Sequence, residues 1–105
     1  NIDLAILGFG SDGHFASIFP CHLYEKEFID LNEEPKILKT TKMGNPCVAR
    51  LTMNLSAFLR VKNIFIIINS NKKLDTFHEA KDNKNLPIYH LLNLENINIE
   101  VIKDF

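Results

Sequence analysis

Apolar residues along the chain gather in segments that predict β-strands. Residues 2–7 form a short, mostly apolar run followed by a glycine-rich segment, which favours a strand buried on both faces. Residues 64–68 are consecutive β-branched or aromatic residues and give the clearest strand signal. Residues 97–101 alternate between apolar and polar, the period of a half-buried strand. Weaker extended segments are expected at residues 37–43, as an edge strand, and at residues 48–53.

Helix signals lie between these strands. Residues 69–71 can cap a helix that runs to about Ala80, because Leu74 and Phe77 are three positions apart. Strands and helices that alternate in this way predict an α/β fold with a Rossmann-like, open and mostly parallel sheet flanked by helices. Shorter helical segments are predicted at residues 14–19 before Pro20, within residues 21–35 as a loop or short helix, at residues 54–60 with Asn54 as N-cap and Leu55, Phe58 and Leu59 on one face, and from Leu86-Pro87 onward.

Composition narrows the class of protein. The chain has 105 residues and 12.1 kDa, which suits a single domain. Hydrophobic residues make up 46% and charged residues 24%, which excludes an intrinsically disordered segment. The formal net charge is -1, so we expect no nucleic-acid partner. No apolar run approaches the roughly 18 residues of a membrane span, and no signal-peptide pattern opens the chain. We therefore expect a soluble, cytoplasmic protein without a membrane partner.

Cysteine and histidine spacing gives no sign of a metal centre. Cys21 and Cys47 stand far apart with no CxxC pair, so neither a zinc site nor a disulfide framework is predicted, and both are expected to be small packing residues. His22, His78 and His90 lack the spacing of metal ligands and are expected to be surface or packing residues. We expect no metal ion.

The glycine-rich segment 8–13 allows two interpretations. Gly8-Phe9-Gly10-Ser11-Asp12-Gly13 matches G-x-G-x-x-G after a strand, the dinucleotide-binding fingerprint. However, Pro20 stops the helix that should hold a pyrophosphate, and the expected acidic residue falls at Glu33-Glu34 inside a polar stretch.

The second interpretation concerns Asp12-Gly13-His14. A histidine behind a glycine loop at the C-terminal end of a buried strand lies where open α/β sheets bind ligands. Its near-neutral pKa suits a general base, and Asp12 could orient the imidazole or stabilise its charged form. An isolated histidine is more often structural, so from these residues alone both roles stay open.

The segment from Asp3 to Pro20 resembles a family signature. It reads DLAILGFGSDGHFASIFP and is similar to the D-L-x-L-L-G-x-G-x-D-G-H-x-A-S-L-F-P of the 6-phosphogluconolactonases. The related glucosamine-6-phosphate deaminases share G-x-G-x-D-G-H but continue A-F-N-E-P. Further similarities follow in order: the R-x-T strand at residues 50–53, an apolar strand and lysine at residues 65–73, Leu86-Pro87, and Asp104. The resemblance places residues 1–105 in the C-terminal portion of a single sugar-phosphate lactonase domain. On this resemblance we expect an N-terminal half to precede these residues, which would account for a chain that opens directly on a strand without an initiator methionine.

The resemblance implies hydrolysis of 6-phospho-D-glucono-1,5-lactone to 6-phosphogluconate in the oxidative pentose phosphate pathway. No cofactor, metal or covalent nucleophile is implied. His14 would activate water as the general base, with Asp12 beside it. Arg50 and Lys73 would bind the 6-phosphate, with neighbouring Lys72 as the competing choice. Substrate-binding backbone groups are expected in the glycine loop, at Gly8, Gly10 and Gly13.

Three alternatives remain open at this point. The first is a glucosamine-6-phosphate deaminase or isomerase, which residues 17–19 oppose because they are not F-N-E. The second is a non-catalytic sugar-phosphate-binding module. The presence of Asp12-Gly13-His14 argues against it, because binding alone needs no base at His14. The third is a dinucleotide-binding domain. We also expect the 105 residues to be inactive by themselves, and the sequence does not indicate an oligomeric state.

Overall fold

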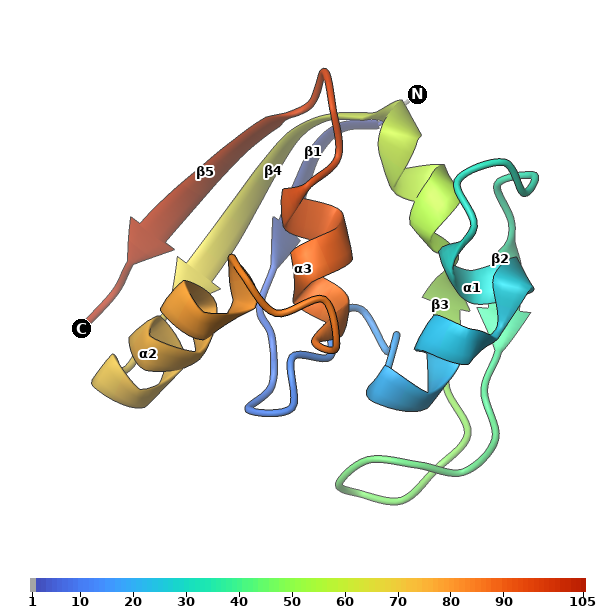
Figure 1. Cartoon of the computed structure of the whole chain (residues 1–105), viewed down its shortest axis with the longest axis horizontal. Helices are drawn as coiled ribbons and strands as arrows, with labels where there is room; N and C mark the ends of the chain where they lie inside the picture. Colours follow the sequence, from blue (N-terminus) through green and yellow to red (C-terminus); the bar gives the residue numbers. More distant parts are fainter. Residues whose placement is uncertain (1) are drawn as a thin grey trace.

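Three parallel strands form the main sheet of the computed structural model, which describes residues 2–105. β1 (Ile2–Leu7), β4 (Val61–Ile68) and β5 (Asn98–Lys103) lie in the order β1-β4-β5 (Figure 1). β4 is the central strand, with Ile64 beside Ala5 of β1 and Ile99 of β5. The predicted strands at 64–68 and 97–101, and the predicted parallel α/β sheet, are confirmed.

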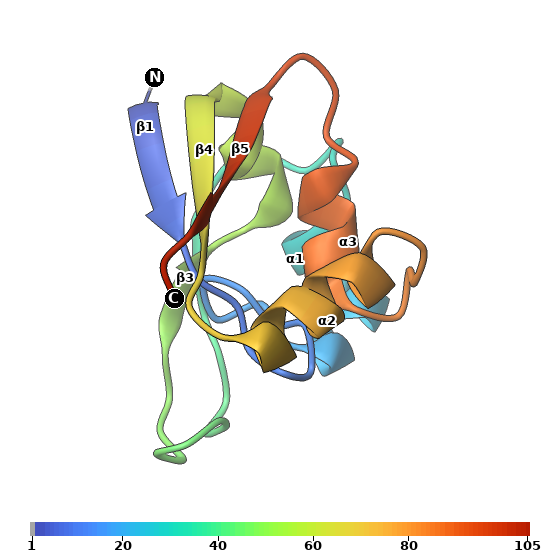
Figure 2. The same cartoon turned by 90° about the vertical axis from the view of Figure 1, so that its left-hand side faces the viewer.

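Helices cover one face of this sheet (Figure 2). They are η1 (Pro20–Tyr24), α1 (Lys26–Ile29), η2 (Leu55–Arg60), α2 (Asn71–Ala80) and α3 (Pro87–Leu92), of which η1 and η2 are 3-10 helices. The predicted helices that end near Ala80 and begin at Leu86-Pro87 are confirmed. None of the helices in residues 2–105 has the length and apolarity needed to span a bilayer.

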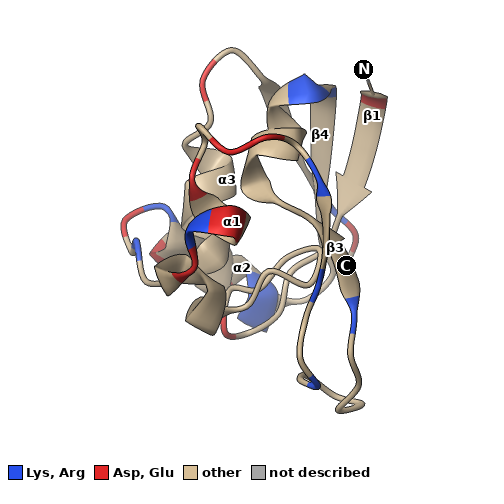
Figure 3. Cartoon of the chain, turned by 90° about the vertical axis from the view of Figure 1, so that its right-hand side faces the viewer, with Lys and Arg blue, Asp and Glu red and all other residues tan. Residues whose placement is uncertain are grey.

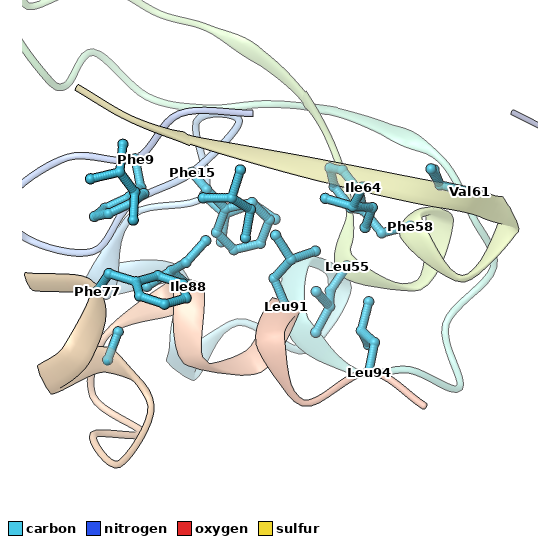
Figure 4. Close-up of a cluster of buried hydrophobic side chains, with 14 residues drawn as sticks. Phe9, Phe15, Leu55, Phe58, Val61, Ile64, Phe77, Ile88, Leu91 and Leu94 are labelled. Carbon is cyan, nitrogen blue, oxygen red and sulfur yellow. The ribbon is translucent and has the colours of Figure 1, made fainter. Parts of the chain in front are cut away.

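The hydrophobic core lies between the helices and β4 (Figure 4). Ile64, Ile66 and Ile68 are fully buried on the helix side of β4. They pack with aromatic and aliphatic side chains from the loops and helices: Phe15, Phe58, Phe77, Ile88 and Leu91. Burying a side chain of this size contributes about 1.5–3 kcal/mol, so this single layer of contacts is the main stabilising feature of the described residues.

No helix formed by residues 2–105 covers the opposite face of the sheet, and this corrects the prediction for residues 2–7. Leu4, Ile6 and Ile102 are 46%, 62% and 38% exposed on this side. β1 is therefore not buried on both faces, and it is also an edge strand because it pairs with β4 alone. A continuous apolar run is typical of a strand with both faces covered, but the segments that would cover those faces lie elsewhere in the sequence. We call this surface the bare face and define it by Leu4, Ile6, Phe65, Ile67 and Ile102.

The predicted helix at residues 14–19 is wrong. The chain instead reverses between Phe15 and Ile18, which pair as an isolated β-bridge. Ala16 and Ser17 form the turn with positive φ values of 47° and 66°. Phe15 and Ile18 are both fully buried, so the reversal directs both side chains into the core. We call Phe15–Ile18 the reverse turn.

The predicted helix at residues 54–60 is correct in place and differs in kind. η2 is a 3-10 helix in which Leu55 and Phe58 are buried, whereas Leu59 is 44% exposed, so these side chains do not share one buried face. Asn54 precedes the helix, but its side chain does not cap it. The side chain instead accepts from the Lys36 backbone N–H and donates to the Glu34 carbonyl. These hydrogen bonds hold residues 34–36 against the start of η2.

β2 (Ile37–Lys39) and β3 (Leu51–Met53) form a separate antiparallel pair. The two predicted extended segments are therefore strands, shorter than expected. Residues 37–53 contain Lys39, Lys42 and Arg50 and no acidic residue (Figure 3). This hairpin brings positive charge toward the carboxyl end of β1.

Candidate active site

The loop after β1 places His14 at the carboxyl edge of the parallel sheet. The backbone N–H of Gly10 donates to the His14 carbonyl at 2.9 Å, and that of Gly13 donates to the Gly10 carbonyl at 2.9 Å. A Cβ at Gly10 would overlap the His14 imidazole, so only glycine leaves room for the ring. Gly10 is therefore needed to accommodate the histidine ring, whereas an added Cβ at Gly8 would meet no other atom within 4 Å.

Gly13 fixes the other end of the loop. Its φ is +81°, and an added Cβ would lie 2.6 Å from Cβ of Leu86. The Gly13 carbonyl accepts from the Ile88 backbone N–H at 2.9 Å. The start of α3 thus contacts the loop at Gly13, which gives a structural reason for glycine at this position.

Asp12 and His14 form a hydrogen-bonded pair. Oδ1 of Asp12 lies 2.5 Å from Nδ1 of His14 and also accepts the His14 backbone N–H at 3.1 Å. Burial by itself would raise the pKa of Asp12, but the hydrogen bonds from His14 outweigh it and the pKa is lowered. An ionised Asp12 accepts the Nδ1 proton, so the lone pair of the neutral ring lies on Nε2. This is the arrangement that a general base needs.

A cavity of about 450 Å³ opens beside this pair. Its walls include the ring of His14, the side chain of Phe19, which stacks on that ring at 4.4 Å between centroids, and the reverse turn. Of the residues predicted from the sequence, the cavity brings together Gly8, Gly10, His14, Arg50 and Lys73. Asp12 and Gly13 are not in its lining and act on it through His14 and the loop backbone.

Arg50 reaches this cavity from the β2–β3 hairpin. Its Nε donates to the Met43 carbonyl at 3.2 Å and its Nη2 donates to the Pro46 carbonyl at 2.7 Å. Within residues 2–105 no carboxylate lies at ion-pair distance from Arg50, so its charge is not neutralised there. The guanidinium carries five N–H groups, and those not bonded to the hairpin remain for an anionic ligand.

Lys73, and not Lys72, lies at the cavity. Both belong to the first turn of α2, which Ser70 caps by accepting the Lys73 backbone N–H at 3.1 Å. Lys73 is half-buried and lines the cavity, whereas Lys72 is exposed and does not. The geometry thus separates two neighbours that the sequence alone could not.

His22 is a packing residue, one of the two roles expected for it. It is 2% exposed, stacks on Phe28 with 3.9 Å between ring centroids, and its Nδ1 accepts the Phe19 backbone N–H at 2.9 Å. Burial lowers the pKa of His22, an effect that Glu25 partly offsets. The neutral ring is therefore the form that the fold stabilises.

We expect this histidine to make the fold less stable in mild acid. The unfolded chain binds the His22 proton near the ordinary pKa of about 6.5 and the folded chain only at lower pH, so stability falls as the pH drops below that value. His22→Asn keeps an acceptor for Phe19 and cannot titrate. Urea unfolding of the complete protein should show a larger loss of unfolding free energy between pH 7.5 and pH 5 for the wild type than for the variant. Equal losses would contradict this role.

The group of Cys21, His22 and Glu25 does not suit a metal ion, although its donor atoms lie within 4.8 Å of one another. Nδ1 of His22 accepts a backbone N–H, so Nε2 carries the ring proton. A metal-bound histidine normally donates through its second nitrogen, which this ring cannot do. The expectation of no metal stays a prediction. Cys21 and Cys47 are exposed free thiols, so their predicted packing role is wrong.

The site combines an aspartate–histidine pair at the carboxyl edge of a parallel sheet with two cationic side chains on the same cavity. This is the arrangement expected of an α/β protein that binds a small anionic ligand. Comparison with known proteins agrees. The chain belongs to the family of glucosamine-6-phosphate isomerases and 6-phosphogluconolactonases, whose family model matches residues 1–98.

The curated relatives are named 6-phosphogluconolactonases. That of Helicobacter pylori is 36% identical over 101 residues, which cover 93% of this chain and 42% of the relative. That of Neisseria meningitidis is 33% identical and covers 94% and 43%. The crystal structure of a 6-phosphogluconolactonase from Shewanella baltica superposes with a TM-score of 0.76 at 26% identity, over 98% of this chain and 44% of that one. The chain thus spans less than half the length of the relatives it matches.

Proposed function

We propose that the protein hydrolyses 6-phospho-D-glucono-1,5-lactone to 6-phosphogluconate in the cytoplasm, and that these residues form the C-terminal portion of one lactonase domain. The observation that carries this proposal is that one cavity is lined by His14 and by Arg50 and Lys73. A base and a pair of cations on the same cavity match the two ends of a phosphorylated lactone. The names of the curated relatives support the same substrate.

His14 acts at the lactone carbonyl. Nε2 takes a proton from a water molecule as the water oxygen forms a bond to C1, and the carbonyl electron pair moves to oxygen. When the carbonyl re-forms, the bond from C1 to the ring oxygen breaks, and His14 returns the proton to that oxygen. Asp12 stabilises the intermediate imidazolium through Nδ1–H. General-base assistance of this kind contributes on the order of 10²–10⁴-fold.

The glycine loop and the cations bind the rest of the substrate. Backbone N–H groups of residues 8–13 are the proposed donors to the developing oxyanion. Arg50 offers a planar fork to the 6-phosphate, and Lys73 adds a second positive charge. No metal or cofactor takes part in this scheme.

A direct assay distinguishes this activity from the related one. The complete protein, as its gene encodes it, is incubated separately with 6-phospho-D-glucono-1,5-lactone and with glucosamine 6-phosphate. We expect lactone loss well above the spontaneous rate and no release of ammonia. Ammonia release without accelerated lactone loss would replace the lactonase proposal with the deaminase one.

The two neighbouring lysines provide a matched pair of variants. Lys73→Gln is expected to raise KM for the phosphorylated lactone about tenfold with a smaller change in kcat, since a charge-assisted contact with the phosphate is worth about 1.5–3 kcal/mol. Lys72→Gln removes the same charge from the same helix turn outside the cavity and should leave KM within about twofold. Steady-state kinetics of both variants test this. Equal effects, or a larger effect at Lys72, would contradict the assignment.

A further inference from the structure

The cavity is built on two sheets that share no strand. His14 follows β1 of the parallel sheet, whereas Arg50 directly precedes β3 of the small antiparallel pair. A substrate that spans the two must find the base and the guanidinium at a fixed separation. The contact that sets this separation is therefore functionally important.

Thr52 makes a direct connection between the two parts. It lies on β3, two residues after Arg50, and is 4% exposed. Its Oγ1 hydroxyl donates to the carbonyl of Ala16, which lies 36 residues away in the reverse turn, and the carbonyl of the adjacent Met53 is 3.0 Å from the same Oγ1. The Ala16 carbonyl accepts no other hydrogen bond among the described residues.

The reverse turn is the part of the His14 segment that most needs such support. Ala16 and Ser17 both adopt positive φ, a conformation that costs non-glycine residues of order 1–3 kcal/mol each. Both residues line the cavity next to His14. A buried hydroxyl that donates to the Ala16 carbonyl restrains this turn and connects it to β3, the strand that directly follows Arg50.

We propose that Thr52 is a positioning residue that sets the distance between the base at His14 and the phosphate-binding Arg50. This inference rests on the proposed lactonase function and deepens it. Thr52 touches neither the water nor the phosphate. It acts by holding the reverse turn against β3, so that C1 and the 6-phosphate of one substrate molecule meet their partners at the same time.

The test compares a ligand that spans the cavity with one that does not. Thr52→Val keeps the side-chain volume but cannot donate, and Thr52→Ser keeps the hydroxyl. Both are made in the complete protein and assayed with 6-phospho-D-glucono-1,5-lactone, with inorganic phosphate as a competitive inhibitor. Inorganic phosphate occupies only the cation end, so its binding does not depend on the separation.

For Thr52→Val we expect kcat/KM to fall about tenfold or more, because a misplacement of about 1 Å can cost on the order of 10²-fold. The inhibition constant of inorganic phosphate should stay within about twofold of wild type, and Thr52→Ser should recover kcat/KM to within about threefold. An unchanged kcat/KM for Thr52→Val would overturn the inference. So would a parallel loss of phosphate inhibition, because Thr52 would then only support the local structure around Arg50.

Two further outcomes have definite meanings. If Thr52→Val does not fold, Thr52→Ala tests the same connection, since alanine also removes the hydroxyl but places no methyl group against the Ala16 carbonyl. The same selective fall in kcat/KM is then expected, and its absence overturns the inference. A wild type that does not accelerate lactone loss overturns the proposed function and the inference together, whereas an active wild type with an unaffected Thr52→Val overturns the inference alone.

Discussion

Replacing His14 with asparagine should lower kcat for 6-phospho-D-glucono-1,5-lactone about a hundredfold or more in the complete protein. Asparagine is polar and of similar size, but it cannot take a proton from water at neutral pH. KM should change little, because Arg50 and Lys73 keep their places at the cavity. Initial rates corrected for spontaneous hydrolysis measure the effect.

His78→Asn is the matched control for this variant. His78 lies exposed near the end of α2 and outside the cavity, so the same substitution there should leave kcat within about twofold. The thermal midpoint of His14→Asn should stay near that of wild type, since the His14 ring is only partly covered. If kcat falls by less than about tenfold while the fold stays intact, the role of His14 as base is contradicted.

The 105 residues alone should show no lactone hydrolysis. Leu4, Ile6 and Ile102 leave apolar surface on the bare face, and β1 presents an unpaired strand edge. The match to the Helicobacter pylori relative covers 93% of this chain but only 42% of that relative. We therefore expect residues outside the matched region to cover the bare face in the complete protein.

This prediction is tested by assaying the purified chain of residues 1–105 beside the complete protein at equal molar concentration. We expect the chain to give only the spontaneous rate of lactone loss and to self-associate in size-exclusion chromatography. Turnover above the spontaneous rate would show that the described residues contain a complete site.

The sequence predicted those parts of the fold that depend on local pattern. The β-branched run at residues 64–68 gave β4, and the alternation at residues 97–101 gave β5. It did not predict the exposure of β1, because an apolar run carries no information about which segments cover it. It also missed the reverse turn, since Ala16 and Ser17 have no preference for positive φ and only the burial of both flanking side chains imposes it.

Some features of the candidate site could likewise be predicted from the sequence, and one could not. Asp12 and His14 are two residues apart, so their pairing follows from local geometry once the glycine loop is known. The positions of Arg50 and Lys73 were predicted from the family resemblance, and the cavity brings both beside His14. The connection from Thr52 of β3 to Ala16 of the reverse turn joins residues 36 apart in the sequence, which no local pattern reveals.

The most direct test of the central claim is a crystal structure of the complete protein with bound 6-phosphogluconate. The account predicts that the C1 carboxylate lies about 3 Å from Nε2 of His14, within hydrogen-bond distance, and that the 6-phosphate contacts Arg50 and Lys73. A product bound in the reverse orientation, with its phosphate at His14, or bound outside this cavity would contradict the account.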